Sequence, residues 1–355
     1  MFKTNNTLIP KFMPDSARFA GRGLTGLANL GNTCFLNSTM QVISHTYEFS
    51  SFLDKGAYRD SLNDCPDTVL LVEWDKLRQL MWSENCCVSP GGFVQSVQKV
   101  AKQCGRDLFT GWAQNDLPEF LMFWFDGIHK ALRRPVVMNI RGKSQNSQDQ
   151  MAIKCFEMMK TMYSKEYSEV VRLFTGIQVS VITSLAGAEH SVSPEPVILV
   201  SLPLPNLPKM NLVDCIKHYT NPELMNQENA WYNDKTKESE DVYKKLSFWM
   251  LPDILVMDLK RFDNRNRKNN KLIEAPLEEL DMSPYVVGYG KRSYVYDLYG
   301  VCNHMGGVHG GHYTANVLNA NGKWYQFNDT RVSEIDPSQV VTSAAYCFFY
   351  RKKNK

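Results

Sequence analysis

The sequence lacks the features that mark secreted and membrane-spanning proteins. Its nine cysteines are an odd number, scattered apart from the pair Cys86-Cys87, and no C-x-x-C spacing occurs. A disulfide framework is therefore disfavoured, and a reducing compartment is expected. The longest apolar runs, such as Phe120 to Phe125 and Ala344 to Tyr350, are too short to cross a bilayer. The opening residues contain no apolar core of signal-peptide length. We expect a soluble intracellular protein, cytoplasmic or nuclear.

An excess of charge of either sign is also absent. The 355 residues include 40 basic and 37 acidic side chains, which gives a net charge of +3. This balance argues against nucleic acid or a membrane surface as a partner. A hydrophobic content of 43% is enough for a large core in one elaborate domain or two. We expect a monomer.

The chain divides into three parts by composition. Residues 1–22 are expected to form a flexible leader, 23–351 a compact domain, and 352–355 a polar tail. Helical periodicity dominates the first third, over 34–47, 68–82, a segment after Pro90-Gly91-Gly92, and a segment opened by Asp116. The polar stretch 141–150 is expected to be an exposed loop, and helical spacing returns over 151–171.

After Leu173 the pattern changes to β-branched and alternating segments. Strands are expected at 177–182, 197–204, 254–259, 294–301, 313–318, 324–327 and 346–351, with Asn321-Gly322 as a hairpin turn. Helices followed by strands indicate an α+β fold, with the reactive groups meeting between the two halves.

Cys34 is a candidate nucleophile. The preceding Gly31-Asn32-Thr33 predicts a tight turn into a helix N-terminus, where the helix dipole favours thiolate and lowers the thiol pKa. A thiolate is the nucleophile that acyl transfer requires. The alternative is a buried core cysteine, which is the usual state of a cysteine without such surroundings.

A second cluster supplies a candidate general base. His312 follows two glycines, and Asn328 and Asp329 lie downstream. The order Cys, His, Asn/Asp is that of papain-like thiol hydrolases. His312 would take the thiol proton and later protonate the leaving amine, while Asn328 or Asp329 would fix its tautomer. The antiparallel hairpin from 313 to 327 is expected to bring Asn328 back beside His312.

Two other interpretations of this cluster remain. Cys302, His304, His309 and His312 have the residue types of a zinc site. The surrounding glycines make a mobile loop rather than a rigid clip, however, and a metal site leaves Cys34 and Asn328 unexplained. The histidines are otherwise surface residues of a glycine-rich loop.

Two further features have both a structural and a functional interpretation. Asn29, five residues before Cys34, is either a donor to the developing oxyanion or a turn residue, and spacing alone fits both. Asp116 and Glu119, with Pro118 between them, form a helix capping box. A role in binding is compatible with capping only if carboxylate oxygens stay free.

Four ordered motifs resemble those of the ubiquitin-specific proteases, a family of papain-like cysteine deubiquitinases. GLANLGNTCFLNSTMQ is similar to the family's Cys box, and NHMGGVHGGHYTANV with KWYQFNDTRVSEI to its His box. QNDLPEF, LKRF and the closing AYCFFY resemble further family segments. The likeness extends over roughly 24–351.

The resemblance implies a fold and a set of site residues. A helical thumb (about 24–135) would face a β-rich palm with fingers (about 170–351), and ubiquitin's C-terminal tail would lie between them. Cys34 would be the nucleophile, His312 the base and Asn328 the orienting residue, with Asp329 assisting and Asn29 completing the oxyanion hole. The positions that match the tail-binding cleft are Asp116, Glu119, Arg261, Phe262, His304 and Tyr313.

The chain departs from the family in its fingers. The zinc-binding cysteine pairs of many members would fall near Ser184 and Gly187 and near Tyr232 and Lys235, where no cysteine stands. We expect no metal and no cofactor, and fingers held by packing alone through Trp231, Phe248 and Trp249. The implied activity is hydrolysis after ubiquitin's terminal glycine, with ubiquitin and ubiquitinated proteins as partners. The alternatives are a catalytically silent ubiquitin-binding scaffold and a protease for a ubiquitin-like modifier.

Overall fold

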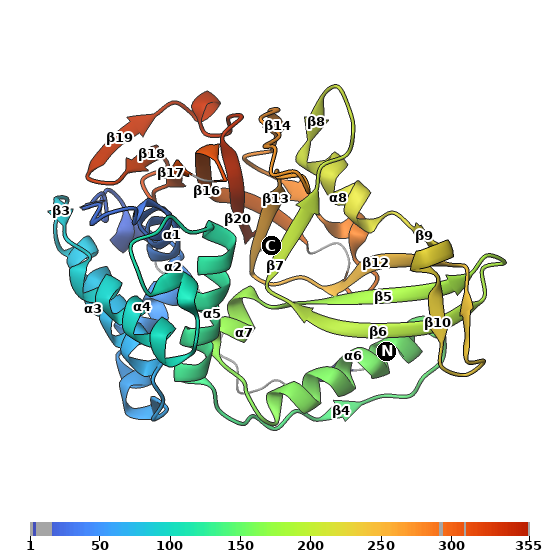
Figure 1. Cartoon of the computed structure of the whole chain (residues 1–355). Helices are drawn as coiled ribbons and strands as arrows, with labels where there is room; N and C mark the ends of the chain where they lie inside the picture. The colour runs from blue at the N-terminus through green and yellow to red at the C-terminus, as the bar shows by residue number, and fades with distance from the viewer. Residues whose placement is uncertain (1–2, 5–15, 291–293, 309, 354–355) are drawn as a thin grey trace.

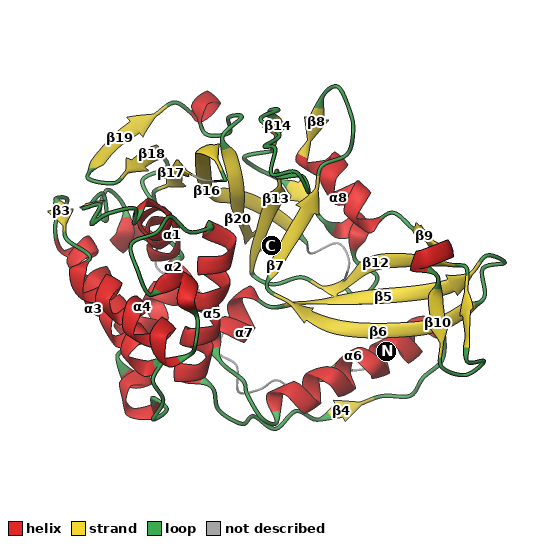
Figure 2. Ribbon diagram, in the orientation of Figure 1, coloured by secondary structure: helices red, strands yellow, loops and turns green. Residues whose placement is uncertain are grey.

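A computed structural model describes residues 3–4, 16–290, 294–308 and 310–353 (Figure 1). The helices of the first third of the chain gather on one side of the molecule, and the strands, with the later helices beside them, make up the rest (Figure 2), as expected for an α+β fold. The helices are α1 (Cys34–Ser44), α2 (Tyr47–Asp54), α3 (Thr68–Ser83), α4 (Gly91–Gln103), α5 (Leu117–Leu132), α6 (Ser147–Tyr163), α7 (Glu169–Phe174) and α8 (Leu212–Thr220). None of the described helices is both long and apolar enough to cross a lipid bilayer.

The thumb is built from α1 to α5. The helices expected at 68–82 and after Asp116 are confirmed as α3 and α5, but the segment 34–47 is not one helix, because α1 ends at Ser44 and α2 begins at Tyr47. Every residue of α1 is buried, and the helix packs against strands β16 (Val295–Gly307), β17 (Gly310–Leu318) and β18 (Trp324–Asn328). At Gly300 of β16 an added Cβ would lie 2.4 Å from Val42 of α1, so this close approach requires glycine.

The palm is an eight-stranded sheet. Its main order is β19 (Arg331–Ile335), β18 (Trp324–Asn328), β17 (Gly310–Leu318), β16 (Val295–Gly307), β20 (Ala345–Lys352), β13 (Ile254–Lys260) and β7 (Leu199–Pro203), and β15 (Leu280–Asp281) also pairs with β16. The pair β7–β13 is parallel and the other pairs are antiparallel. The expected turn at Asn321-Gly322 joins β17 to β18, with Gly322 at φ 79°.

The fingers extend to the right of the palm in Figure 1. Their sheet has the order β6 (Glu189–Val197), β5 (Gly176–Ser184), β12 (Val242–Met250) and β9 (Glu223–Met225), and a hairpin of β10 (Trp231–Asn233) and β11 (Glu238–Glu240) stands at the tip. Helix α6 covers one face, where Phe156 contacts Trp249 edge to face. Shorter parallel pairs are β2 (Gly26–Leu27) with β3 (Cys87–Val88), and β8 (Met210–Asn211) with β14 (Ile273–Glu274).

The segments expected to be a leader, an exposed loop and a polar tail contain regular structure in part. In the leader, β1 (Lys3–Thr4) pairs with β4 (Ile140–Arg141), and Phe19 is buried and stacks on Tyr47. Residues 1–2 and 5–15 lie outside the described part. In the expected loop 141–150, Arg141 belongs to β4 and α6 already begins at Ser147. At the expected tail, β20 includes Lys352, and the N–H of Lys353 donates to the carbonyl of Val295.

Candidate active site between α1 and the β17–β18 hairpin

Cys34 is the first residue of α1, as the sequence predicts. The turn before it uses left-handed backbone at Gly31 (φ 104°) and Asn32 (φ 55°). The thiol is nearly enclosed, with the residue 3% exposed. The sulfur is therefore buried beside the start of α1 rather than presented at the surface.

The environment of the Cys34 thiol differs from the expectation in one respect. Burial raises its pKa above the ordinary value, and the nearby Asp329 carboxylate adds to the rise. The backbone N–H of Tyr313 opposes this by favouring the thiolate. The predicted lowering of the pKa is thus wrong, because burial outweighs the contacts that favour the thiolate. The Tyr313 contact also brings the Cys34 and His312 segments together.

His312 and Asn328 meet as the hairpin geometry predicts. Nε2 of His312 lies 2.7 Å from Oδ1 of Asn328. An amide oxygen only accepts, so Nε2 carries the proton in this pair. Nδ1 of the neutral ring then keeps its lone pair and can accept a proton.

Asn29 is a turn residue whose amide also contacts Asp329. Its Oδ1 accepts from the backbone N–H groups of Gly31 and Thr33, both at 3.1 Å, which shapes the turn before Cys34. Its Nδ2 donates to Oδ2 of Asp329 at 3.0 Å. The second N–H of this amide has no acceptor among the described residues, so a donor is available beside the turn that carries Cys34.

Asp329 occupies a different place from the one expected. Its carboxylate does not contact His312: Oδ2 accepts from Asn29, and Oδ1 accepts from Nδ2 of Asn37 at 2.8 Å. Asp329 adopts φ 50°, outside the range that most side chains prefer. The prediction that it assists in orienting the imidazole is therefore wrong, and it holds the amide of Asn29 instead. Sequence reasoning missed Asn37, although an asparagine one turn after the nucleophile was a visible signal.

Four of the six residues expected to bind a substrate tail line one hollow. Its volume is about 240 Å³, and its walls include Gln114, Asn115, Gly307 and Val308 beside the predicted Asp116, Phe262, His304 and Tyr313. The rings of His304 and Tyr313 are 4.6 Å apart. Burial, with the charge of Lys268, lowers the pKa of His304 to about 4, so the His304 ring is uncharged at neutral pH.

Asp116 is both a helix cap and a wall of the hollow. Its Oδ1 accepts from the N–H of Glu119 at 3.3 Å, as the capping box predicts, and its Oδ2 accepts from the hydroxyl of Tyr346 at 2.8 Å. Burial raises its pKa, and these two hydrogen bonds oppose the rise. Both oxygens are thus engaged before any substrate arrives.

The other two predicted binding residues lie elsewhere. Glu119 lines a neighbouring hollow of about 550 Å³ together with Leu108 and Met122. Arg261 is 1% exposed and donates to the carbonyls of Ala345, Asn269 and Lys271. It fastens a loop to the palm sheet, and the prediction that it lines the cleft is wrong.

Gln114 spans the cleft, a contact that motif matching did not reveal. From the loop before α5, its Oε1 accepts from the N–H of Gly311 at 2.6 Å and its Nε2 donates to the carbonyl of Gly311 at 3.0 Å. Both backbone groups of the residue before His312 therefore bind the side chain of Gln114.

Comparison with known proteins identifies the family. Residues 25–350 match the family described as ubiquitin carboxyl-terminal hydrolase. The chain belongs to this family. Ubiquitin carboxyl-terminal hydrolase 2 of Bos taurus is 33% identical over 345 residues, covering 93% of this chain and 55% of the relative. Ubiquitin carboxyl-terminal hydrolase 21 of Homo sapiens is 31% identical over 356 residues, covering 93% and 62%. The chain thus spans little more than half the length of these relatives.

Solved structures support the same fold. The SAGA Ubp8/Sgf11/Sus1/Sgf73 DUB module bound to ubiquitin aldehyde contains a chain that matches with a TM-score of 0.72 at 23% identity, over 97% of this chain and 72% of that one. The fold is therefore the papain-like α+β fold of the ubiquitin carboxyl-terminal hydrolases, with thumb, palm and fingers.

The fingertip of this family member is fastened by polar contacts. The Glu240 carboxylate accepts from Nδ2 of Asn233 at 2.8 Å and from Oγ1 of Thr236 at 2.9 Å, and it lies 3.5 Å from Nε2 of His190. His190 in turn stacks on Trp231 at 5.6 Å. The prediction that packing alone holds the fingers is therefore wrong.

A metal site at the His box is not supported by the strand geometry. His304 pairs with Tyr313, and His312 pairs with Met305, so the two histidines project from opposite faces of the β16–β17 ladder. The described residues contain no group of three or more His, Cys, Asp or Glu side chains suited to a metal ion. His309 lies outside the described residues.

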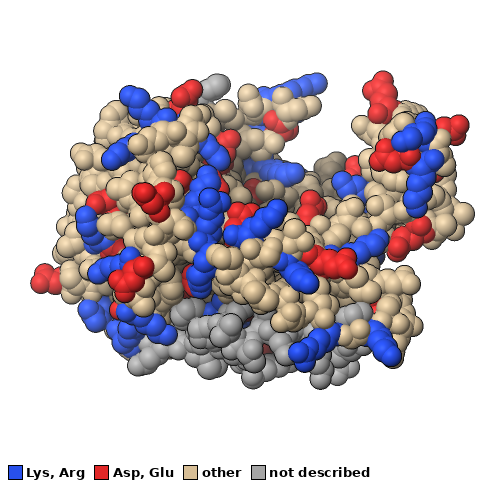
Figure 3. Space-filling view, turned by 90° about the horizontal axis from the view of Figure 1, so that it is seen from below, with Lys and Arg blue, Asp and Glu red and all other residues tan. Residues whose placement is uncertain are grey.

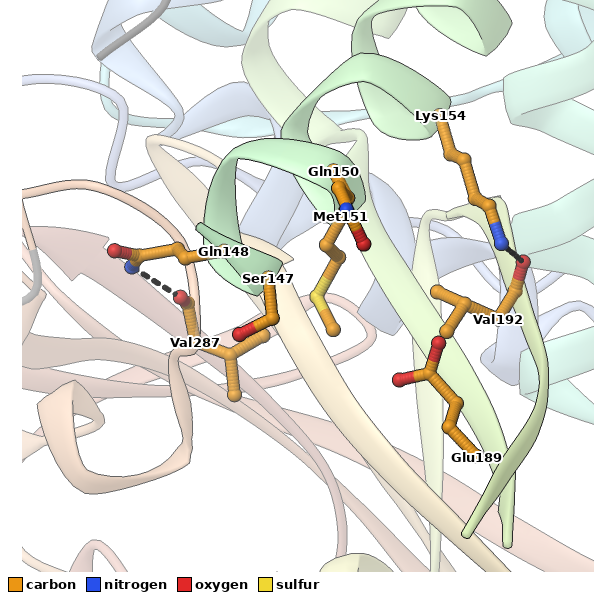
Figure 4. Close-up of a pocket in the computed structure, with 8 residues that line it drawn as sticks. All are labelled: Ser147, Gln148, Gln150, Met151, Lys154, Glu189, Val192 and Val287. Carbon is orange, nitrogen blue, oxygen red and sulfur yellow. Dashed lines mark hydrogen bonds between the residues drawn. The ribbon is translucent and has the colours of Figure 1, made fainter. Parts of the chain in front are cut away.

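A second pocket lies under the fingers and is separate from the candidate active site. It has a volume of about 310 Å³ and opens between the N-terminal turns of α6, strand β6 and Val287 (Figure 4). Gln148 donates to the carbonyl of Val287, and Lys154 reaches the carbonyl of Val192. None of the predicted site residues lines it.

Proposed function

We propose that this chain is a thiol-dependent deubiquitinase that hydrolyses the isopeptide or peptide bond after the C-terminal glycine of ubiquitin. The observation that carries the proposal is the 2.7 Å pair of His312 and Asn328, on the hairpin whose Tyr313 N–H interacts with the Cys34 thiol. Family membership supports the same chemistry. In this proposal residues 23–351 are the catalytic domain.

The reaction needs only side chains of this chain. Nδ1 of His312 takes the thiol proton, and the sulfur of Cys34 attacks the carbonyl carbon of the terminal glycine. Asn29 and the backbone N–H of Cys34 stabilise the negative oxygen that forms. Collapse breaks the C–N bond as His312 protonates the leaving amine. A water molecule, deprotonated by His312, then hydrolyses the thioester and returns the thiol.

The surfaces around the cleft fit a modifier with a slender tail. Beside His312, an added Cβ at Gly311 would lie 2.4 Å from Nε2 of His304, so the backbone at this point has no room for a side chain. A tail ending in two glycines suits a site this crowded, because it carries no side chains of its own there. Beyond it, Figure 3 shows the surface hollowed beside the fingers, with acidic and basic side chains interspersed. Such a surface suits a folded modifier of mixed charge.

A ubiquitin that carries a thiol-reactive group in place of its C-terminal carboxylate tests the proposal. We expect a covalent adduct with the parent protein and with Cys104→Ser, a matched control at an exposed cysteine, but none with Cys34→Ala. An adduct on Cys34→Ala would contradict the assigned nucleophile. No adduct with measurable ubiquitin binding would favour the silent scaffold, and reaction only with another modifier's probe would favour a ubiquitin-like substrate.

A further inference from the structure

Cys86 and Cys87 are adjacent, exposed and free thiols that the proposed reaction does not use. Cys87 begins β3, which pairs with β2 so that Gly26 lies opposite Cys87. The N–H of Gly26 donates to the carbonyl of Cys86 at 2.8 Å. The peptide group that joins the two cysteines is therefore part of the ladder that holds β2.

Strand β2 leads directly to Asn29 and is clamped on both edges. Ala28 donates to the carbonyl of Val88 at 2.9 Å on one side, and Leu27 donates to the carbonyl of Asp329 at 2.9 Å on the other. An added Cβ at Gly26 would lie 2.2 Å from the carbonyl oxygen of Thr330. This packing prevents β2 from shifting along its own axis. A change in the backbone of β3 therefore also changes the segment that positions Asn29 and Asp329.

We infer that Cys86 and Cys87 are a site of reversible oxidation by hydroperoxides, whose disulfide form detaches β3 from β2 and switches off catalysis. The loss of catalysis rests on the proposed function, whereas the oxidation and the detachment do not.

The oxidation balances with one hydroperoxide. One thiolate attacks a peroxide oxygen, so that the O–O bond breaks, an S–O bond forms and, with hydrogen peroxide, the first water leaves after protonation. The neighbouring thiolate then attacks that sulfur, the S–S bond forms, the S–O bond breaks and a second water leaves. The two thiols lose two electrons in total, and the peroxide gains them.

The disulfide is incompatible with the ladder in which these residues stand. Neighbouring Cα atoms are about 3.8 Å apart across a trans peptide, whereas disulfide-bonded cysteines usually have Cα atoms about 4.4–6.8 Å apart. Extended backbone also points successive side chains to opposite faces, so joining the two sulfurs requires the backbone at Cys86 and Cys87 to twist. The hydrogen bond from Gly26 to the carbonyl of Cys86 cannot survive that twist. Strained, exposed disulfides are readily reduced, which makes the change reversible.

The test compares the parent protein with Cys86→Ser, Cys87→Ser and the control Cys104→Ser, each treated with limiting hydrogen peroxide and then with dithiothreitol. Peptide mapping after alkylation should find the Cys86–Cys87 link in the parent and in Cys104→Ser only. Amide exchange over residues 24–29 should rise with the link and return on reduction. Both readouts are independent of ubiquitin.

The activity readout uses a fluorogenic ubiquitin C-terminal conjugate. Loss of one oxyanion donor lowers kcat by roughly 10²- to 10³-fold, so the linked parent should lose about that factor with KM little changed and recover with dithiothreitol. The two serine variants share Cys34 with the parent, so a difference between them and the parent isolates the pair from oxidation of the nucleophile. Free thiols at both positions after peroxide, unchanged exchange in the linked protein, or equal inactivation of parent and serine variants would overturn the inference. If no form hydrolyses the conjugate, the proposed function fails and with it the loss of catalysis, while mapping and exchange still decide the oxidation and the detachment.

Discussion

The amide of Asn29 is fixed at its oxygen by two backbone N–H groups and at its nitrogen by the Asp329 carboxylate. A group held this firmly needs no rearrangement when negative charge develops on the substrate, which is the condition under which a hydrogen bond lowers a barrier most. The same bonds shape the turn before Cys34. Substitution should therefore affect both rate and stability, and the two effects have to be measured separately.

Asn29→Ala is expected to lower kcat by roughly 10²- to 10³-fold with little change in KM, because the lost donor acts on the transition state. Steady-state hydrolysis of a ubiquitin conjugate measures this, and a urea titration of the same variant measures the turn. Asn32→Gly, which keeps the left-handed turn and removes a neighbouring side chain, is the control. A variant that unfolds earlier in urea but turns over normally would reduce Asn29 to a turn residue.

Asp329→Asn should separate thiol reactivity from turnover. Removing the charge that raises the pKa of Cys34 lowers that pKa, so alkylation of Cys34 by iodoacetamide should extend to lower pH. Turnover should fall about tenfold, equivalent to roughly 1.4 kcal/mol, because Asn29 loses a charged acceptor. Asp336→Asn, at a cap that contacts Ser338, is the matched control. If alkylation and turnover move in the same direction, the assigned role is wrong.

At the scale of single residues, the sequence predicts which side chains belong to the candidate site better than it predicts their hydrogen-bond partners. His312 meets Asn328, and the N–H of Tyr313 reaches the Cys34 thiol, because a helix start and a two-stranded hairpin have fixed geometries that local patterns reveal. Asp329 and Arg261 were misplaced because their partners, Asn37 and the carbonyls of Asn269 and Lys271, are set by tertiary packing. No spacing rule in the sequence contains that information.

The β10–β11 hairpin shows how one carboxylate can organise an element. The Glu240 carboxylate contacts Asn233, Thr236 and His190 at the fingertip. The hydrogen bonds from Thr236 and Asn233 lower the pKa of Glu240. The hairpin is a two-stranded ribbon, and such ribbons are weakly stable by themselves. The contacts to Glu240 therefore decide whether the tip keeps its shape.

Glu240→Ala is expected to raise amide exchange over residues 231–240 and to raise KM for ubiquitin conjugates while kcat stays unchanged, because the tip is remote from the reacting atoms. Glu238→Ala, an exposed residue of the same hairpin, is the control.

Metal analysis of the purified protein should find no stoichiometric zinc, and a chelator should leave amide exchange at the fingertip unchanged. One zinc per chain, or a response to the chelator, would contradict this account of the fingers.

Elements were predicted well where one pattern ran without interruption. Strand β13 and helices α3 and α5 are of this kind. Strand β6 was missed because Pro194 and Pro196 break its pattern; it is an edge strand, where proline is tolerated. The split between α1 and α2 was missed because the apolar stripe continues across Thr46, which serves as the N-cap of α2.

Thumb and palm are joined by buried polar groups whose titration makes stability depend on pH. His45 is fully buried at the end of α1, where its Nδ1 lies 2.8 Å from the carbonyl of Gln41 and its ring packs against Trp82 and Phe327. Burial lowers its pKa to about 4 from an ordinary 6.5. Below pH 6.5 the His45 imidazole binds a proton in the unfolded chain but stays neutral in the folded protein. The free energy of unfolding therefore falls as pH falls, and the loss is complete below about pH 4.

His45→Gln keeps a donor for the Gln41 carbonyl and removes the titration. Between pH 7 and pH 5 the parent should lose roughly 2 kcal/mol more unfolding free energy than this variant, from about 1.5 pKa units at 1.36 kcal/mol each. Urea titrations at the two pH values measure the difference. His218→Gln, at an exposed position of α8, should behave as the parent does, and parallel losses in all three proteins would exclude His45 as the cause.

Strand β20 comes after every other strand in the sequence, yet it lies inside the palm sheet between β16 and β13. Its Arg351 reaches across to Glu48 of the thumb at 2.9 Å and to the carbonyl of His45. A ribosome releases the chain from its N-terminus, so Cys34 and His312 are both synthesised before the strand that completes the sheet around them. Until residues 345–352 emerge, the palm has a gap at its centre. Nascent chains therefore carry Cys34 and His312 without the completed sheet, and the proposed hydrolysis is expected to begin only when synthesis has passed this strand.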